Sequence, residues 1–204
     1  MIKNIIFDFG DIFINLDKPA TVQTLTTLFG KFEVSDEMNE KNQAYEMGLI
    51  SSEEFTSFYQ SVFPQATKEK LITAWNAILK DFPEERLLFL EKLAKQYNYR
   101  LFLLSNTNDL HIEYVIKTVS PEFFERFKNC FEQFYLSQQL KMRKPNADIF
   151  EHVLKENNLN AQETLFIDDT LENTEAAKKL GIHVWNLIPR KDDITQLFEQ
   201  PFKF

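Results

Sequence analysis

The chain has 204 residues, enough for one domain with an insertion or for two small domains. Its formal net charge of −8 argues against a nucleic-acid binder, because such proteins gather Lys and Arg against phosphates. One cysteine excludes an intrachain disulfide, and no apolar run approaches the ~20 residues of a membrane helix. We therefore expect a cytoplasmic protein that binds neither nucleic acid nor a membrane. Cys130 and most of the 21 phenylalanines are predicted to fill its core.

The first predicted element is a short apolar strand at residues 4–8, "NIIFD", which ends in Asp8. Residues 16–82 follow, and they contain several amphipathic helical stretches but no convincing buried strand. One stretch begins with a capping box, in which Ser51 and Glu54 precede an apolar helix face. This part of the chain predicts an all-helical insertion.

From Pro83 onward, apolar runs alternate with helical periodicities. Runs that are apolar throughout are typical of strands buried on both faces of a parallel sheet, and they occur at 100–106, 131–137, 164–169 and 182–187. Helical periodicity occurs at 84–96, 147–158 and 172–181. The alternation predicts an α/β fold, a doubly wound (Rossmann-like) parallel sheet core built from residues 1–15 and 83–204. The all-helical cap domain is then inserted at residues 16–82.

Polar side chains gather where the predicted strands end. Ligands bind outside the carboxyl ends of the strands in an open parallel sheet, so these positions are candidate site residues. The strand ends carry Asp8, Ser105, Asn106, Asp168 and Asp169. Lys144, in "RKP", precedes a predicted helix that begins near residue 147. Adjacent acids suit Mg²⁺, which takes one or two carboxylates together with substrate oxygens.

Four motifs, in this order, resemble those of the haloacid dehalogenase (HAD) superfamily, and within it the phosphatases with a helical cap inserted after the first motif. "FDFGDIF" is similar to the nucleophile motif, "LLSNTN" to the hydroxyl motif, "RKPNADIF" to the lysine motif and "FIDDTLEN" to the acidic metal motif. The resemblance runs over almost the whole chain. It points to the branch that includes α-glucose-1-phosphate phosphatase-like proteins, in which Asp-x-Gly replaces Asp-x-Asp.

The resemblance implies a nucleophile and a metal site. Asp8 would attack phosphorus and form an aspartyl-phosphate that water then hydrolyses. Mg²⁺ would be held by Asp8, Asp169 and the backbone carbonyl of Gly10, with Asp168 beside the metal, through water or behind its direct ligands.

The resemblance also implies contacts to the substrate. Ser105 would donate a hydrogen bond to a phosphoryl oxygen, and Lys144 would neutralise charge on the phosphate and on Asp8. Asn106 and Asp11 are further candidates for substrate binding.

The chain departs from the superfamily pattern at Gly10, where most members have a second Asp that protonates the leaving oxygen. Such help is typically worth ~10²–10⁴-fold in rate. A leaving group that needs little protonation, a metal-ordered water, or a substitute acid such as Asp11 or Asp17 would each compensate. Asp11 also has a conformational explanation, since Asp tolerates a left-handed backbone. A second departure is Lys141, where related sequences commonly have Gly.

Structural alternatives apply to the same residues. Ser105 and Asn106 are also explained as a capping segment for the helix that contains "DLHIEYVI", and Lys144 as a plain surface lysine. For the acidic pair at the end of the run at 164–169 the alternative is a solvated helix start, which two acids at the end of an apolar strand make less favoured than metal binding. The three histidines lack metal-ligand spacing and are expected to be structural or surface residues, with His111 the one candidate for the rim of the site.

The sequence thus predicts a Mg²⁺-dependent phosphomonoesterase that acts on a small phosphorylated metabolite, with sugar phosphates among the candidates. A non-catalytic homologue that binds a phosphorylated ligand or a protein partner is the alternative from another class. A metal-independent haloacid dehalogenase is disfavoured, because Asp168 and Asp169 would repel a halocarboxylate with no cation present. A phosphomutase would need the missing acid all the more. The substrate and the oligomeric state are not predicted.

Overall fold

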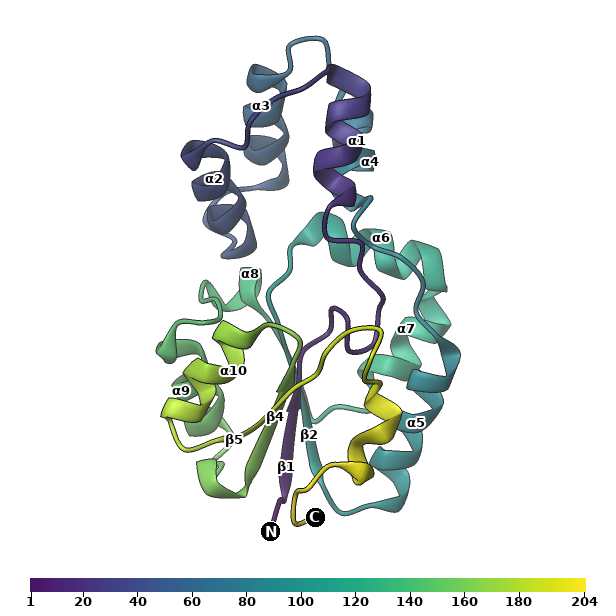
Figure 1. Cartoon of the computed structure of the whole chain (residues 1–204), viewed down its shortest axis with the longest axis vertical. Coiled ribbons are helices and arrows are strands. Elements are labelled where there is room, and N and C mark those ends of the chain that lie inside the picture. Colours follow the sequence, from purple (N-terminus) through teal and green to yellow (C-terminus); the bar gives the residue numbers. More distant parts are fainter.

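Five parallel strands form the central sheet of the computed structural model, which describes all 204 residues (Figure 1). The strand order is β3-β2-β1-β4-β5, with every neighbouring pair parallel. The strands are β1 (Asn4–Phe7), β2 (Arg100–Ser105), β3 (Gln133–Leu136), β4 (Thr164–Asp168) and β5 (His183–Asn186). The predicted doubly wound parallel sheet is confirmed.

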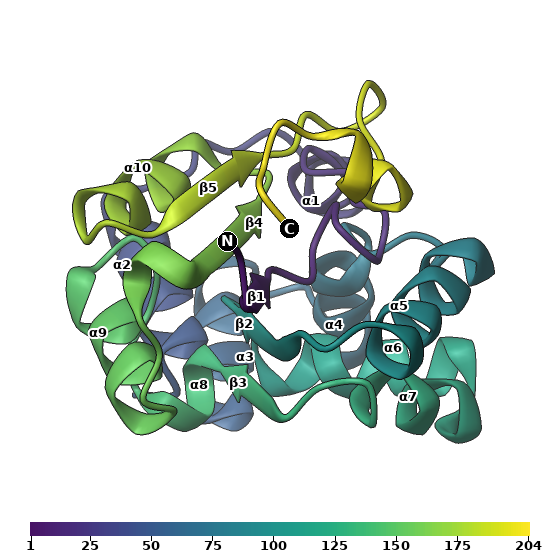
Figure 2. The same cartoon turned by 90° about the horizontal axis from the view of Figure 1, so that it is seen from below.

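Helices cover both faces of this sheet (Figure 2). One face packs against α5 (Glu84–Gln96), α6 (Asp109–Val119), α7 (Pro121–Lys128) and the 3₁₀ segment η2 (Ile194–Glu199). The other face packs against α9 (Ala147–Glu156) and α10 (Leu171–Lys179), and the short elements α8 (Ser137–Leu140) and η1 (Ala161–Glu163) complete the core. Along β1, Ile5 and Phe7 enter the first cluster and Ile6 the second. Burial on both faces explains why the strands are apolar throughout.

Phenylalanines fill much of the first cluster, as expected. The Phe127 ring lies 5.0 Å from the rings of Phe13 and Phe82, measured between centroids. Cys130 is half-buried and packs against this cluster from its edge, so the prediction of a core cysteine is only partly right.

Four further helices, which we call the cap, stand between β1 and α5 at one end of the sheet (Figure 1). They are α1 (Ala20–Phe29), α2 (Asp36–Glu46), α3 (Ser52–Val62) and α4 (Lys68–Asn76). The cap has its own apolar cluster, to which α6 adds Leu110. Ser51 and Glu54 form the predicted capping box at the start of α3. Because the cap encloses a cluster separate from the two at the sheet, it packs as a distinct layer.

The chain crosses between sheet and cap twice, and the two crossings run antiparallel. Leu16 and Leu79 form an antiparallel bridge, and the Asp17 amide donates to the Ile78 carbonyl at 2.8 Å. Both crossings lie close to the ends of the insertion expected at residues 16–82. None of the helices is long and apolar enough to cross a membrane.

A second junction joins the end of α2 to α8. The Ser137 hydroxyl donates to the Glu46 carbonyl at 2.6 Å, and Lys141 Nζ donates to the Gly48 carbonyl. The two backbones approach so closely that a Cβ on Gly48 would lie 2.1 Å from the Gln138 carbonyl oxygen. The cap is therefore held over the sheet by the paired crossings and this junction, in addition to its packing on α6.

Replacing Gly48 by Ala is expected to lower the free energy of unfolding by about 1–3 kcal/mol, as overpacking does. The new methyl group would collide with a backbone atom, which cannot rotate away, and Gly48 also has a positive φ of 61°. Urea denaturation measures the change.

Gly30→Ala is the matched control, since Gly30 has a φ of 92° but a Cβ added to it would meet no atom within 4 Å. We expect the control to lose less stability than Gly48→Ala. Equal losses of unfolding free energy in the two variants would mean that backbone strain alone, and not the close approach to Gln138, disfavours a side chain at residue 48.

Candidate active site

A cavity of about 440 Å³ lies between the carboxyl ends of the strands and the cap. This volume falls within the range of small-molecule sites in proteins. Six predicted site residues from separate segments line it together: Asp8, Gly10, Ser105, Asn106, Lys144 and Asp169. Of the other two predicted residues, Asp168 is fully buried behind the wall and Asp11 lines a neighbouring groove.

The centre of the site is the buried ammonium of Lys144. Its Nζ donates to Asp8 Oδ1 at 2.7 Å, to Asp168 Oδ2 at 2.6 Å and to the Leu104 carbonyl at 2.8 Å. Three acceptors satisfy all three ammonium protons. The side chain is only 1% exposed, so the explanation of Lys144 as a surface lysine is wrong.

The charges at this centre depend on one another. Burial raises the pKa of Asp8 to about 7, although the nearby Lys144 ammonium lowers it. Burial also lowers the pKa of Lys144, but Asp168 and Asp8 outweigh that effect and hold it above its ordinary value. Lys144 therefore stays protonated at neutral pH, whereas additional positive charge nearby would favour the ionised form of Asp8.

Asp168 is enclosed by donors from α10 and the turn before it. Its Oδ1 accepts from the Thr170 amide at 2.8 Å, and Asn173 Nδ2 lies 3.1 and 3.0 Å from its two oxygens. With the Lys144 bond added, both oxygens are engaged. A solvated helix start does not describe this residue, so that explanation of the acidic pair is wrong for Asp168.

Three carboxylates converge beside Lys144. One oxygen each from Asp8, Asp168 and Asp169 lie within 4.8 Å of one another. Such a concentration of negative charge is unfavourable without cations, and carboxylate oxygens are the ligands that Mg²⁺ takes. The residues present therefore fit a hard divalent ion, with Asp169 on the cavity wall and Asp168 already occupied by protein donors.

Ser105 ends β2 and Asn106 follows it, both at the edge of the cavity. Asn106 Nδ2 donates to the Lys144 carbonyl at 2.8 Å, and Asn106 Oδ1 accepts from the Lys144 amide at 2.9 Å. These two bonds fasten the lysine loop to the end of β2. The N-cap residue of α6 is Asn108, whose Oδ1 accepts from the His111 amide. The explanation of Ser105 and Asn106 as the capping segment of this helix is therefore wrong.

The loop after Asp8 places Gly10 on the cavity wall and turns Asp11 away. A Cβ on Gly10 would lie 2.8 Å from Leu16 Cδ1. Asp11 has a φ of 55°, and its Oδ1 accepts from the Leu16 amide at 2.9 Å. Asp11 and Asp17 both line the neighbouring groove rather than the cavity that holds Asp8. These observations agree with the conformational explanation of Asp11.

Sequence reasoning missed Lys18, which follows the first crossing into the cap. Its Nζ donates to Asp169 Oδ2 and lies 3.6 Å from Asp11 Oδ2. Lys18 is far from any strand end along the sequence, and its position just after the nucleophile motif was the only signal. Burial raises the pKa of Asp169 while Lys18 lowers it.

His111 lines the cavity, as expected for a rim residue, and connects it to the cap. Its ring stacks on Trp75 of α4 at 5.2 Å between centroids. Because the Trp75 carbonyl only accepts, His111 Nε2 must donate to it, which leaves Nδ1 to accept from Asn108 Nδ2. Burial lowers the pKa of His111 to about 4, so the ring is neutral at pH 7. A neutral imidazole makes His111 a structural contact between α4 and α6.

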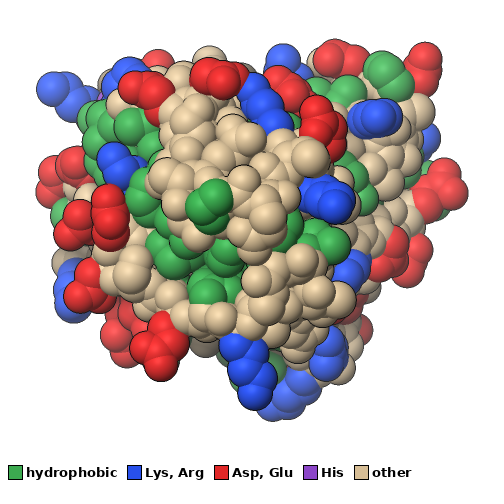
Figure 3. Space-filling model, turned by 90° about the horizontal axis from the view of Figure 1, so that it is seen from above, with side chains coloured by type: hydrophobic (Ala, Val, Ile, Leu, Met, Phe, Trp, Pro, Cys, Tyr) green, Lys and Arg blue, Asp and Glu red, His purple; other side chains and the backbone are tan.

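The face of the molecule seen from the cap end carries acidic and basic side chains interspersed (Figure 3). With a net charge of −8, the overall field does not attract an anion. Attraction of an anionic ligand must come from groups inside the cavity, such as Lys144, Lys18 and Arg143.

Comparison with known proteins shows the family to which the chain is similar. The family model described as haloacid dehalogenase-like hydrolase matches residues 5–187. The D-ribitol-5-phosphate phosphatase of Bacteroides thetaiotaomicron is 30% identical over 194 residues, which cover 91% of each chain.

Solved structures of similar proteins belong to the same family. The magnesium complex of a HAD family enzyme from Bacteroides thetaiotaomicron has a TM-score of 0.87 and 32% identity, covering 98% of this chain and 99% of that one. A further structure of that enzyme, in complex with magnesium and inorganic phosphate, has a TM-score of 0.82 and 33% identity over 97% and 100% of the two chains. A predicted HAD-like family hydrolase from Porphyromonas gingivalis is also similar, with a TM-score of 0.76 and 30% identity over 98% and 99%.

Proposed function

Because the chain belongs to the haloacid dehalogenase-like hydrolases, we propose that the cavity is a phosphatase active site for a small, hydroxyl-rich phosphate monoester. The observation that carries the proposal is the buried Lys144 ammonium, held between Asp8 and Asp168 with Asp169 beside them. A nucleophilic carboxylate, a fixed positive charge and an acidic metal-binding cluster are what phosphoryl transfer to an aspartate requires.

In the proposed reaction, Asp8 attacks phosphorus in line as the bond to the leaving oxygen breaks. Lys144 engages only Oδ1 of Asp8, so Oδ2 has no donor from the protein and faces Gly10. Lys144 also neutralises charge that develops on the phosphoryl oxygens, and Ser105 donates its hydroxyl to one of them. Water then attacks the phosphorus of the aspartyl-phosphate, releasing inorganic phosphate and restoring the carboxylate.

Mg²⁺ is the cofactor that fits these residues and that relatives of this chain hold. Asp8, Asp169 and the Gly10 carbonyl would hold it, and Asp168 would support the site from behind, consistent with its full set of protein donors. When bound, the ion supplies positive charge to the phosphoryl group in the transition state.

Gly10 leaves the site without the acid that most superfamily members have. Leu16 occupies the direction in which a side chain on residue 10 would project, and neither Asp11 nor Asp17 lines the cavity. We therefore propose that the proton for the leaving oxygen comes from ordered water, or that the leaving group needs little protonation. Resemblance to the α-glucose-1-phosphate phosphatase-like branch makes sugar 1-phosphates one candidate substrate class.

The D-ribitol-5-phosphate phosphatase relative makes alditol phosphates a second candidate class. The hydrolytic dehalogenase alternative has little support, because the chain is only 16% identical to the L-2-haloacid dehalogenase of Xanthobacter autotrophicus, a likeness of fold alone. The non-catalytic alternative predicts binding of phosphate analogues without turnover. A cytoplasmic location stays a prediction.

Phosphate release from a panel of substrates tests the proposal. The panel contains p-nitrophenyl phosphate, sugar 1-phosphates, sugar 6-phosphates and alditol phosphates, each with Mg²⁺ or with EDTA. We expect release that needs Mg²⁺ and that EDTA reduces at least about 10²-fold, since metals typically contribute several kcal/mol to transition-state stabilisation. Undiminished release in EDTA would contradict the metal site. Binding of phosphate analogues without any release would favour the non-catalytic alternative.

A further inference from the structure

Glu46 is an acidic residue of the cap that reaches the catalytic cavity. It ends α2 and lines the cavity together with Asp8 and Lys144. Its backbone is fixed by the Ser137 hydroxyl, which donates to the Glu46 carbonyl at 2.6 Å. The position of this carboxylate therefore depends on the second junction between cap and core, and not on a flexible loop.

Arg143 holds this carboxylate from the core side. Arg143 Nη2 donates to Glu46 Oε2 at 3.1 Å. The Arg143 side chain is 23% exposed to solvent and the Glu46 side chain 27%. The guanidinium makes this one hydrogen bond to the protein, and its Nε is buried without a hydrogen-bond partner. With one bond made and the Nε buried, the remaining N–H groups on the two Nη atoms leave Arg143 with capacity for a ligand.

The pair stands next to the phosphate-binding lysine. Arg143 immediately precedes Lys144, while Glu46 comes from the opposite, cap side of the cavity. Burial raises the pKa of Glu46, whereas Arg143 lowers it, so the ionised carboxylate depends on its partner. A substrate whose phosphate lies at Asp8 and Lys144 would present the rest of its chain to this pair.

We propose that Glu46 and Arg143 select substrates whose end remote from the phosphate is hydroxylated and uncharged, and reject substrates with a second anionic group there. A hydroxyl donates to Glu46 and accepts from Arg143 without separating them. A carboxylate or second phosphate instead brings a second negative charge up to the Glu46 carboxylate, and moving Glu46 off Arg143 to avoid it takes away its countercharge in a partly buried site. This inference rests on the proposed phosphatase function and specifies its substrate class.

The test compares two substrates that differ only at the remote end, a pentitol 5-phosphate and the pentonate 5-phosphate of the same configuration. We expect wild-type kcat/KM to favour the pentitol phosphate by at least about tenfold, as like charges in a binding site usually do. Glu46→Gln should reduce that preference about tenfold, mainly by raising kcat/KM for the pentonate phosphate, because Arg143 is then free to bind its carboxylate.

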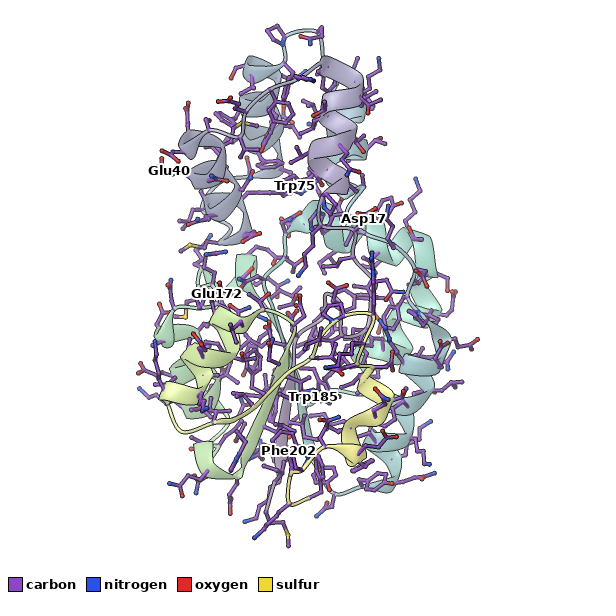
Figure 4. The ribbon with its side chains drawn as sticks, in the orientation of Figure 1. Asp17, Glu40, Trp75, Glu172, Trp185 and Phe202 are labelled. Atoms are coloured by element: carbon purple, nitrogen blue, oxygen red, sulfur yellow. The ribbon has the colours of Figure 1, made fainter.

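Two further variants complete the design. Arg143→Gln should strengthen the preference for the pentitol phosphate, since it removes the positive charge that could bind a second anionic group at this end of the cavity. Glu40→Gln is the matched control on the same helix, because Glu40 is exposed on the outer side of the cap (Figure 4), and it should leave the preference unchanged.

The outcomes separate this inference from the phosphatase proposal. If both substrates are hydrolysed and Glu46→Gln and Arg143→Gln keep the wild-type preference, the selectivity of this pair is refuted while the phosphatase function stands. If wild type releases phosphate from neither these substrates nor the wider panel, the proposed phosphatase function is refuted. The inference about Glu46 and Arg143 is then refuted too, because it rests on that function.

Discussion

Asp8→Asn is expected to slow phosphate release at least about 10⁴-fold, the scale of loss seen when other enzymes lose a nucleophile. An amide has nearly the shape of a carboxylate but lacks the charge needed to attack phosphorus. The amide oxygen can still accept from Lys144, so the fold should be retained. Single-turnover and steady-state assays with p-nitrophenyl phosphate would measure the loss.

Two controls accompany this prediction. Asp148→Asn changes an exposed acid in the first turn of α9 and should keep wild-type activity. Circular dichroism and thermal unfolding of Asp8→Asn establish that the variant is folded. A folded Asp8→Asn protein with more than about a hundredth of wild-type activity would refute the aspartyl-phosphate route, because no other carboxylate is positioned to replace it at that rate.

Lys144→Met is expected to lower the free energy of unfolding by about 3–5 kcal/mol, in addition to abolishing turnover. The substitution removes the cation that Asp8 and Asp168 share, and both carboxylates then lie buried close to each other. Methionine fills similar volume, so the loss reports charge and hydrogen bonding more than packing. Urea denaturation without divalent ions measures it.

The charge explanation can be checked with a second substitution. Adding Asp168→Asn to Lys144→Met removes one of the two repelling carboxylates and should recover part of the lost stability. Mg²⁺ should also stabilise Lys144→Met through the remaining acids, by an amount that grows with its concentration. If Lys144→Met unfolds at the same urea concentration as wild type, the buried ion pairs contribute nothing to stability.

Much of the core could be predicted from local patterns. Runs such as "RLFLLSN" and "TLFIDD" are apolar throughout because their strands are buried on both faces, and the structure has strands at each of them. Parallel strands bring their carboxyl ends to one edge, so polar residues at those ends must converge. For this reason the amino-acid sequence alone is enough to predict that Asp8, Ser105 and Asp169 belong to one site.

The cap and the partners of each side chain needed the tertiary structure. Glu46 carries no local signal, and Lys18 has only its position just after the nucleophile motif, since charged residues on helices and linkers are usually solvated. Their roles depend on how the cap docks, which is decided by close approaches such as that of Gly48 to Gln138.

The acidic pair illustrates the same division between sequence and structure. The sequence by itself determined that two adjacent acids end a buried strand, and thereby predicted a cation site at this edge of the sheet. Only the tertiary structure distinguished Asp168, enclosed by Lys144 and Asn173, from Asp169 on the cavity wall. Asp168 is the last residue of β4 and Asp169 lies just beyond it, and what each side chain meets depends on helices and loops from other parts of the chain.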